Sequence, residues 1–158
     1  MSETTPAWLA DRLEKEGDKV VAYFSPLTDE QWQTEVYIEG ETWTVRNVLA
    51  HFVTSERGLL KLFQRIREGG PGATEDFSID YYNARQQAKT RNLTPQELLQ
   101  QYIAVRAATI DWVSGLAQEE LAIEGRHPFM GQVQLVEMLK MLYLHNQLHF
   151  RDFRKLVE

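Results

Sequence analysis

Two histidines near the end of the chain, His145 and His149, have the residue type and spacing that best suit chemistry. They are four positions apart, so on an α-helix their imidazole rings lie side by side on one face. Neutral imidazole is a common ligand of divalent metal ions, and two adjacent rings can share one cation. Alternatively, each ring lies in the core and is satisfied by a hydrogen bond. Taken alone, the pair does not decide between these interpretations.

The segment from Gln132 to Glu158 must position this pair. It contains no Pro or Gly and is rich in Leu, Met, Gln, Glu and Lys, which predicts a helix. At about 100° per residue, both histidines fall with apolar side chains in one arc of about 80°. This stripe consists of Leu135, Met138, Leu142, His145, His149, Phe153 and Leu156. The two histidines are therefore expected to face the interior of the protein.

A third histidine, His51, is predicted on the inward side of another helix. That helix runs from Thr44, a suitable N-cap, to about Glu68, and its apolar stripe begins at Val48. His51 lies within about 60° of Val48 on the helical wheel. In a bundle, side chains from facing helices can converge in the core, where bundle metal sites are built. Three imidazoles would leave one coordination position open, as in catalytic zinc sites.

Two further long helices are predicted from their capping signals. The first begins at Thr5-Pro6, where an N-cap precedes Pro at the first helical position, and ends at Ser25-Pro26. The other begins at Thr94, which opens a capping box, and frays near Gly115. Together with the two helices that carry the histidines, this makes four long helices, and strand-type alternation is nearly absent. We therefore predict an all-α four-helix bundle in a single domain, residues 1–158.

Gly, Pro and polar residues mark the segments between these helices. Residues 69–72 (GGPG) are the clearest loop, and a short helix is expected within residues 76–90. Residues 34–42 and 124–131 are also predicted to be loops, the first with a little extended structure. The connections after the first two helices exceed the two to eight residues usual in simple up-down bundles. One or more crossovers are therefore expected.

Composition argues against several classes of function. The net charge of −6 disfavours nucleic acid as a general partner, because phosphate binding needs a basic face. No segment approaches the roughly 20 apolar residues of a membrane span, and the acidic N-terminal segment is not a secretory signal. Cysteine is absent, which excludes disulfides, thiolate ligands and a cysteine nucleophile. We expect a cytoplasmic location and no membrane partner. A catalytic thiol would have to be supplied by a separate small molecule, because the protein has none.

Two motifs in the sequence resemble the DinB/YfiT-like superfamily. They are residues 43–51 (WTVRNVLAH), which open a helix and end on His51, and residues 145–149 (HNQLH) of the last helix. The resemblance extends over essentially the whole chain in helix order. It implies a metal-binding four-helix bundle with up-down-down-up topology and long crossover connections. It also implies that His51, His145 and His149 bind one divalent ion, for which zinc and nickel are the favoured metals.

Several activities are implied by this resemblance. The superfamily includes thiol-dependent S-transferases and isomerases, hydrolases, and proteins of no known activity, and dimers are common in it. We expect no fused C-terminal domain of the kind that some thiol-dependent isomerases carry, which disfavours a maleylpyruvate isomerase. We expect a homodimeric, thiol-S-transferase-like enzyme that uses a low-molecular-weight thiol and acts on a small electrophilic substrate. The alternatives are a hydrolase using metal-bound hydroxide, a non-catalytic metal-binding stress or interaction protein, and a metal-free bundle with three core histidines.

Other polar residues have weaker predicted roles. Asn146 follows His145 directly, so the H-E-x-x-H motif of zincin proteases and its general base are missing. Asp152 could orient a ligand, although a solvated carboxylate near a helix end is the more common case. Glu56 is expected at the surface, and His127 in a loop without a site role. Three arginines could bind an acidic thiol but are mostly expected to be surface charges: Arg46, Arg85 and Arg151.

Overall fold

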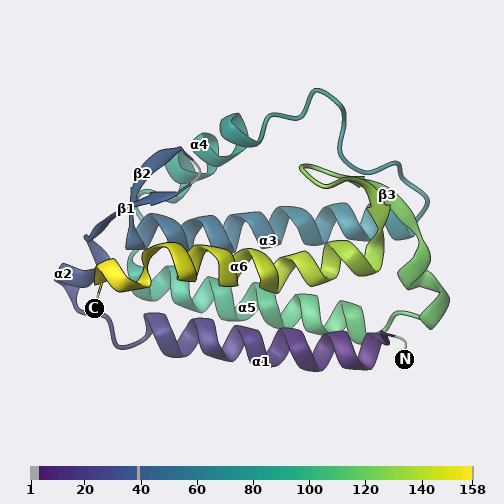
Figure 1. Cartoon of the computed structure of the whole chain (residues 1–158), viewed down its shortest axis with the longest axis horizontal. Helices are drawn as coiled ribbons and strands as arrows, with labels where there is room; N and C mark the ends of the chain where they lie inside the picture. Colours follow the sequence, from purple (N-terminus) through teal and green to yellow (C-terminus); the bar gives the residue numbers. More distant parts are fainter. Residues whose placement is uncertain (1–3, 39, 158) are drawn as a thin grey trace.

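Four long helices form the body of the molecule in the computed structural model, which describes residues 4–38 and 40–157. They are α1 (Pro6–Phe24), α3 (Val45–Arg67), α5 (Pro95–Ser114) and α6 (Leu135–Val157). Helices α1 and α6 run in one direction, and α3 and α5 run in the other (Figure 1). This confirms the predicted bundle and its up-down-down-up topology. The connection between α3 and α5 runs back along the length of the bundle, as a crossover must (Figure 1).

Side-chain caps begin three of these helices at the predicted residues. The Thr5 side chain accepts a hydrogen bond from the backbone N–H of Trp8 at the start of α1. Thr44 and Thr94 each form a capping box at the start of α3 and α5. Each cap satisfies backbone donors that the first turn of a helix leaves without intrahelical partners.

Three short helical elements lie in the connections. Helix α2 (Asp29–Trp32) begins with a capping box at Thr28, and α4 (Ile79–Thr90) is the short helix expected before α5. A 3₁₀ helix, η1 (Gln118–Ala122), follows α5. Helix α4 lies over α3, on the side away from α1 (Figure 1).

Two short antiparallel hairpins stand where loops were predicted. Strand β1 (Glu35–Ile38) pairs with β2 (Glu41–Thr44), and β3 (Glu124–His127) pairs with β4 (Gly131–Gln134). The loop predicted at residues 124–131 was therefore wrong, and the segment 34–42 contains more extended structure than expected. Helix α6 begins three residues later than predicted, because residues 132–134 belong to β4. Strands of four residues are too short for alternation to be recognised in the sequence.

The apolar core consists of two clusters, one toward each end of the bundle. One includes Phe24, Phe52, Tyr102 and Phe153, and the other includes Leu13, Phe63, Val113 and Leu139. The prediction that Leu156 belongs to the inward stripe of α6 was wrong, since this residue is 61% exposed. The buried face continues from Phe153 to Val157 instead, because residues four apart lie on the same side of a helix. Within the described residues, no helix carries an apolar stretch long enough to cross a bilayer.

Candidate metal centre

The three histidines predicted as metal ligands meet between α3 and α6. His51 comes from α3, and His145 and His149 come from successive turns of α6. One ring nitrogen of each lies within 4.8 Å of the other two. The Nε2 atom of His145 is 3.2 Å from Nε2 of His51 and 2.8 Å from Nε2 of His149. His51 and His149 are buried, whereas His145 is partly exposed, so the group is reached from one side.

The spacing of these nitrogens fits a shared divalent ion. Metal–nitrogen bonds of about 2.0–2.1 Å place two ligand nitrogens of a tetrahedral site about 3.4 Å apart. The two Nε2–Nε2 distances, 3.2 and 2.8 Å, approach that value, so small side-chain rotations would suffice. Across residues 4–38 and 40–157, no other group of three His, Asp or Glu side chains has such spacing. A donor set of imidazoles suits zinc, nickel, copper and iron alike.

Neighbouring side chains orient the rings of His51 and His149. The hydroxyl oxygen of Ser55 lies 3.1 Å from Nδ1 of His51, one turn along α3. When Nδ1 donates to this oxygen, the lone pair of Nε2 faces the other two histidines. The rings of Trp43 and Phe52 pack against His51 and His149, with centroids 5.1 Å and 5.9 Å away. Ring orientation is thus set by packing and by one polar contact.

A cleft of about 1440 Å³ opens beside the three histidines. Helices α3, α4 and α6, residues 72–74, 77 and 78, and the tip of the β3–β4 hairpin line it. Its apolar lining includes Leu59, Leu62, Phe77, Phe129, Met141 and Leu148. Its charged lining includes Arg57, Lys61, Arg65, Lys89, Asp80 and Asp152. The cleft therefore suits a small molecule that has both apolar and anionic parts.

One end of α4 is attached to α3 through Tyr82. Its hydroxyl donates a 2.9 Å hydrogen bond to the backbone carbonyl of Thr54. This approach requires a glycine at position 58, because a Cβ on Gly58 would lie 2.5 Å from the Tyr82 oxygen. The close contact holds α4 against α3 beside the cleft.

The other end of α4 is attached by polar contacts near the start of α3. Asn47 donates to the side chain of Gln87 at 3.0 Å, and Gln87 donates to the backbone carbonyl of Asn47 at 2.8 Å. Arg46 donates to the carbonyl oxygens of Thr90 and Leu93. Arg46 is therefore bound to the backbone after α4, where it caps carbonyls at a helix C-terminus. The other two arginines considered as thiol ligands, Arg85 and Arg151, are exposed and do not line the cleft.

His127 is buried in β3 rather than located in an open loop, which corrects the sequence prediction. It is 1% exposed, and its Nδ1 accepts hydrogen bonds of 3.3 Å from the backbone N–H groups of Phe129 and Met130. Burial, with a smaller contribution from His145, lowers the pKa of His127 to about 4. His127 is therefore neutral at pH 7. It orders the hairpin tip that places Phe129 at the cleft and does not belong to the three-histidine group.

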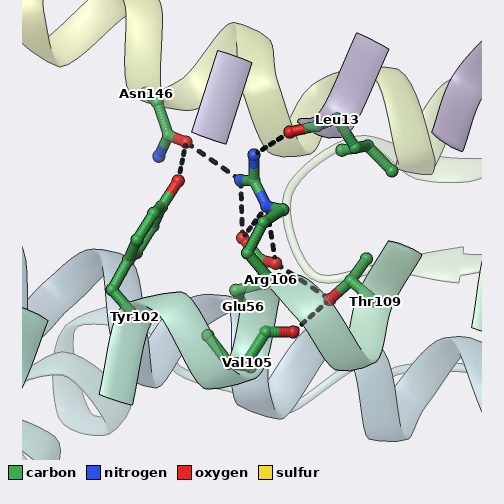
Figure 2. Close-up of polar contacts among 7 residues, drawn as sticks. All are labelled: Leu13, Glu56, Tyr102, Val105, Arg106, Thr109 and Asn146. Carbon is green, nitrogen blue, oxygen red and sulfur yellow. Dashed lines mark hydrogen bonds and ion pairs between the residues drawn. The ribbon is translucent and has the colours of Figure 1, made fainter. Parts of the chain in front are cut away.

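Glu56 lies in the core, so its predicted surface position was wrong. It is 3% exposed and forms an ion pair with Arg106 of α5, with 2.7 Å between Oε1 and Nη2. The hydroxyl of Thr109 also donates to Glu56, at 2.8 Å (Figure 2). The sequence predictions did not include Arg106 as a residue of structural or functional interest. It could have been recognised from the sequence, because it is a charged residue among the apolar positions of the helix that begins at Thr94.

Comparison with known proteins identifies the family. A profile of the DinB superfamily matches residues 12–153. The chain belongs to the DinB superfamily. This agrees with the motifs around His51 and His145, and with the bundle topology. No curated protein matches the sequence significantly.

Several solved structures share the fold of this chain. YfiT from Bacillus subtilis, described as a probable metal-dependent hydrolase, has 20% identity and a TM-score of 0.79, covering 99% of this chain and 87% of YfiT. The colibactin self-resistance protein ClbS, solved with double-stranded DNA, has 12% identity and a TM-score of 0.72, covering 98% of each chain. A mutant of the mycothiol-dependent maleylpyruvate isomerase has 16% identity and a TM-score of 0.73, covering 95% of this chain and 63% of the isomerase. At these identities the likeness shows the fold.

Proposed function

We propose that this DinB protein is a divalent-metal-dependent enzyme, thiol-S-transferase-like, with His51, His145 and His149 as the metal ligands. The observation that carries the proposal is the convergence of three ring nitrogens within 4.8 Å of one another beside an open cleft. Structural zinc sites usually close the coordination sphere with four protein ligands, whereas three ligands leave a position for a reacting group. The geometry therefore favours a catalytic role over a structural one.

The residues around the histidines support a thiol as the reacting group. A divalent ion bound here would favour the deprotonated form of a thiol or of water at neutral pH. The chain has no cysteine, so a small external thiol must supply the sulfur. The cations that line the cleft, among them Lys61 and Arg65, suit the carboxylates of an acidic thiol. Apolar side chains such as Phe77 and Phe129 suit the electrophilic partner. The mycothiol-dependent isomerase has the same fold, which adds support.

Hydrolysis is the second candidate, and the likeness to YfiT favours it. The same ligands would serve, with water in place of the thiol. A carboxylate that could accept the proton of that water is available in Asp152, which lines the cleft and is exposed. Asn146 is unsuitable as a base, since an amide does not titrate and its oxygen accepts from Arg106 and Tyr102.

Metal content is the first test. Protein purified without a histidine tag should contain about one divalent ion per chain by elemental analysis, and His145→Ala should lose it. The matched control is His127→Asn, which alters a buried histidine outside the group and should keep the ion. Wild-type protein that stays metal-free after incubation with zinc or nickel would refute the proposal.

Turnover separates the two chemistries. Metal-loaded protein is assayed with a generic electrophile in the presence and absence of bacillithiol, mycothiol or glutathione. Turnover that depends on the thiol supports the transferase, and turnover of ester substrates without thiol supports the hydrolase. A metal-loaded protein with neither activity would instead support a non-catalytic binding role.

A small molecule, rather than nucleic acid, is our proposed ligand for the cleft. The net charge of −6 supports this choice, although ClbS, which shares the fold, was solved with DNA. A gel-shift experiment with double-stranded DNA tests it directly. A homodimer and a cytoplasmic location stay predictions, which light scattering and cell fractionation can check.

A further inference from the structure

The guanidinium of Arg106 on α5 has hydrogen-bond partners on the other long helices, α1, α3 and α6, and Figure 2 shows these contacts. Arg106 extends from α5, and its Nη1 donates to the carbonyl of Leu13 on α1 at 2.9 Å. Its Nε and Nη2 donate to the carboxylate of Glu56 on α3 at 2.9 and 2.7 Å. Its Nη2 also donates to Oδ1 of Asn146 on α6 at 3.2 Å. Arg106, Glu56 and Asn146 are each at most 4% exposed, so this network is shielded from water.

The network separates the two apolar clusters of the core. On α3, Glu56 lies between Phe52 of one cluster and Phe63 of the other. On α6, Asn146 lies between Leu142 and Phe153 in the same way. A buried ion pair is weak evidence for stability, because apolar side chains of similar volume often stabilise a core equally well. Its presence here points to a role in fixing how the helices are placed.

The two partners of Arg106 on α3 and α6 are close in sequence to the proposed metal ligands. Asn146 follows His145 directly, and Glu56 is five residues after His51. Few backbone positions of α3 and α6 lie close together, and the cleft that both helices line reaches Glu56 and Asn146. Near the histidines the two helices meet through the ring of Phe52, which packs against His149 and Phe150. The backbone of α3 lies closer to that of α5, and the backbone of α6 lies closer to that of α1. Arg106 is thus a polar link that crosses beneath the cleft from one ligand-bearing helix to the other.

Other residues hold Arg106 in this position. A Cβ at Gly17 of α1 would lie 3.0 Å from Cγ of Arg106, so the absence of a side chain there gives the arginine room. The hydroxyl of Tyr102 donates to the same Oδ1 of Asn146 at 3.4 Å. Burial lowers the pKa of Arg106, but Glu56 raises it by more, so its pKa is above the ordinary value. The arginine therefore stays charged and keeps its contacts.

We propose that Arg106 is a positioning residue: by binding Glu56 and Asn146 together, it sets the placement of His51 relative to His145 and His149. This inference rests on the proposed metal site. A planar guanidinium has donors in fixed directions, so it can hold a carboxylate and an amide oxygen in a defined geometry. An apolar pair of equal volume would fill the same space without defining the register of the two helices.

The test uses a variant expected to stay folded. Arg106→Met alone leaves Glu56 buried without its counter-charge, so the paired variant Glu56→Met/Arg106→Met is compared with wild type. The matched control is Arg67→Met/Glu120→Met, which removes a more exposed ion pair at the end of α3. The readouts are metal affinity by chelator competition and the visible spectrum of the Co²⁺-loaded protein, which reports coordination geometry.

We expect the paired variant to unfold cooperatively, to bind metal about 10- to 100-fold more weakly and to show an altered Co²⁺ spectrum. The control should match wild type in both readouts. Arg106→Lys should bind metal more tightly than the paired variant but more weakly than wild type, because one ammonium group cannot reproduce the several donors of a guanidinium. A folded paired variant with wild-type affinity and spectrum would overturn the inference.

A measurement on metal-free protein separates this inference from the proposed function. Failure of wild-type protein to bind metal would refute the proposed function and leave the positioning role testable. The ¹⁵N resonances of the imidazoles in histidine-labelled protein report how the three rings contact one another. They should shift in the paired variant and not in the control. Identical histidine spectra for wild type and the paired variant would overturn the positioning role in the absence of any metal.

Discussion

The Nε2 atoms of His51 and His145 lie 3.2 Å apart, although 94 positions separate the two residues in the chain. Antiparallel helices bring them together, and His149 adds a third nitrogen 2.8 Å from that of His145. All three donors are imidazoles, so a divalent ion bound to their neutral forms would keep its full charge. Such a centre favours an anionic fourth ligand such as a thiolate or hydroxide.

Replacing Ser55 by Ala should weaken metal binding with little effect on folding. The variant removes the hydroxyl that lies 3.1 Å from Nδ1 of His51, and loss of such a partner typically costs 10- to 100-fold in affinity. We expect about a 10-fold rise in the metal dissociation constant, measured by chelator competition. The control is Ser114→Ala, which removes a helical serine bound to the carbonyl of Ile110 far from the histidines. Equal affinities for the two variants would show that Ser55 does not orient His51.

Replacing Gly72 by Ala should destabilise the edge of the cleft. Gly72 has φ of +98°, and a Cβ there would lie 2.5 Å from the backbone N and O of Arg126 in β3. The variant should disturb the hydrogen bond from the Ala73 N–H to the Arg126 carbonyl. We expect a loss of more than about 2 kcal/mol in the free energy of unfolding, measured in urea.

Gly69 provides the matched control for this experiment. It also has a positive φ, +101°, but a Cβ there would have no neighbour within 4 Å. Gly69→Ala should therefore lower the free energy of unfolding through backbone strain alone, by about 1 kcal/mol. If Gly72→Ala and Gly69→Ala lower the free energy of unfolding equally, the contact between residue 72 and β3 contributes nothing beyond backbone strain.

His127 should make the protein less stable as the pH falls from about 6.5 to about 4. The unfolded chain, with a histidine pKa near 6.5, takes up a proton in this range, whereas the folded chain, with a pKa of about 4, does not. The unfolded state is therefore favoured by up to about 1.4 kcal/mol per pH unit, or about 3 kcal/mol in total. Well above pH 6.5 neither state is protonated, so this contribution to the pH dependence is absent.

The variant His127→Asn tests this pH dependence. Asparagine retains an acceptor for the backbone N–H groups of the hairpin tip but does not titrate. Its unfolding free energy, measured in urea at several pH values, should fall less steeply than that of wild type between pH 6.5 and 4. The remaining histidines are common to both proteins, so the difference in slope isolates His127. Parallel curves would contradict the lowered pKa.

Gly58 and Tyr82 should be energetically coupled. In Gly58→Ala the new Cβ would lie 2.5 Å from the Tyr82 oxygen, which displaces α4 and breaks the hydrogen bond to Thr54. The higher helix propensity of Ala offsets about 1 kcal/mol of the cost of this clash. We therefore expect a net loss of about 1–2 kcal/mol in the free energy of unfolding. In a Tyr82→Phe background the same change should cost less, because the clashing oxygen is gone. Additive effects in this double-mutant cycle would mean that the two residues do not interact.

Features that depend on a few neighbouring residues were predicted well from the sequence. The N-caps Thr5, Thr44 and Thr94 were correct, because a cap joins residues only three positions apart. The spacing of His145 and His149 placed both rings on one helical face for the same reason. The hairpin from β3 to β4 was missed, because its four-residue strands gain their stability from pairing and from packing on the bundle.

Whether a polar residue was buried could not be predicted from its own helix. Glu56 lies off the apolar stripe of α3 and looked like a surface residue, yet it is buried because Arg106 neutralises it. Leu156 lies on the predicted stripe of α6, yet its side chain is mostly exposed in the described part of the chain. In both cases the burial of the side chain depends on which residues from other parts of the chain pack against that side of the helix.

The sequence by itself determined the helices, their caps and breaks, the all-α class and the candidate ligands, because these follow from periodicity and from contacts between near neighbours. Only the tertiary structure decided that three ring nitrogens converge beside a cleft, and that Arg106 binds partners 50 and 40 positions away on α3 and α6. The physical reason is that a helical wheel gives the direction of each side chain around its own axis. How two helices pack, and hence which side chains meet, depends on the packing of all of them together.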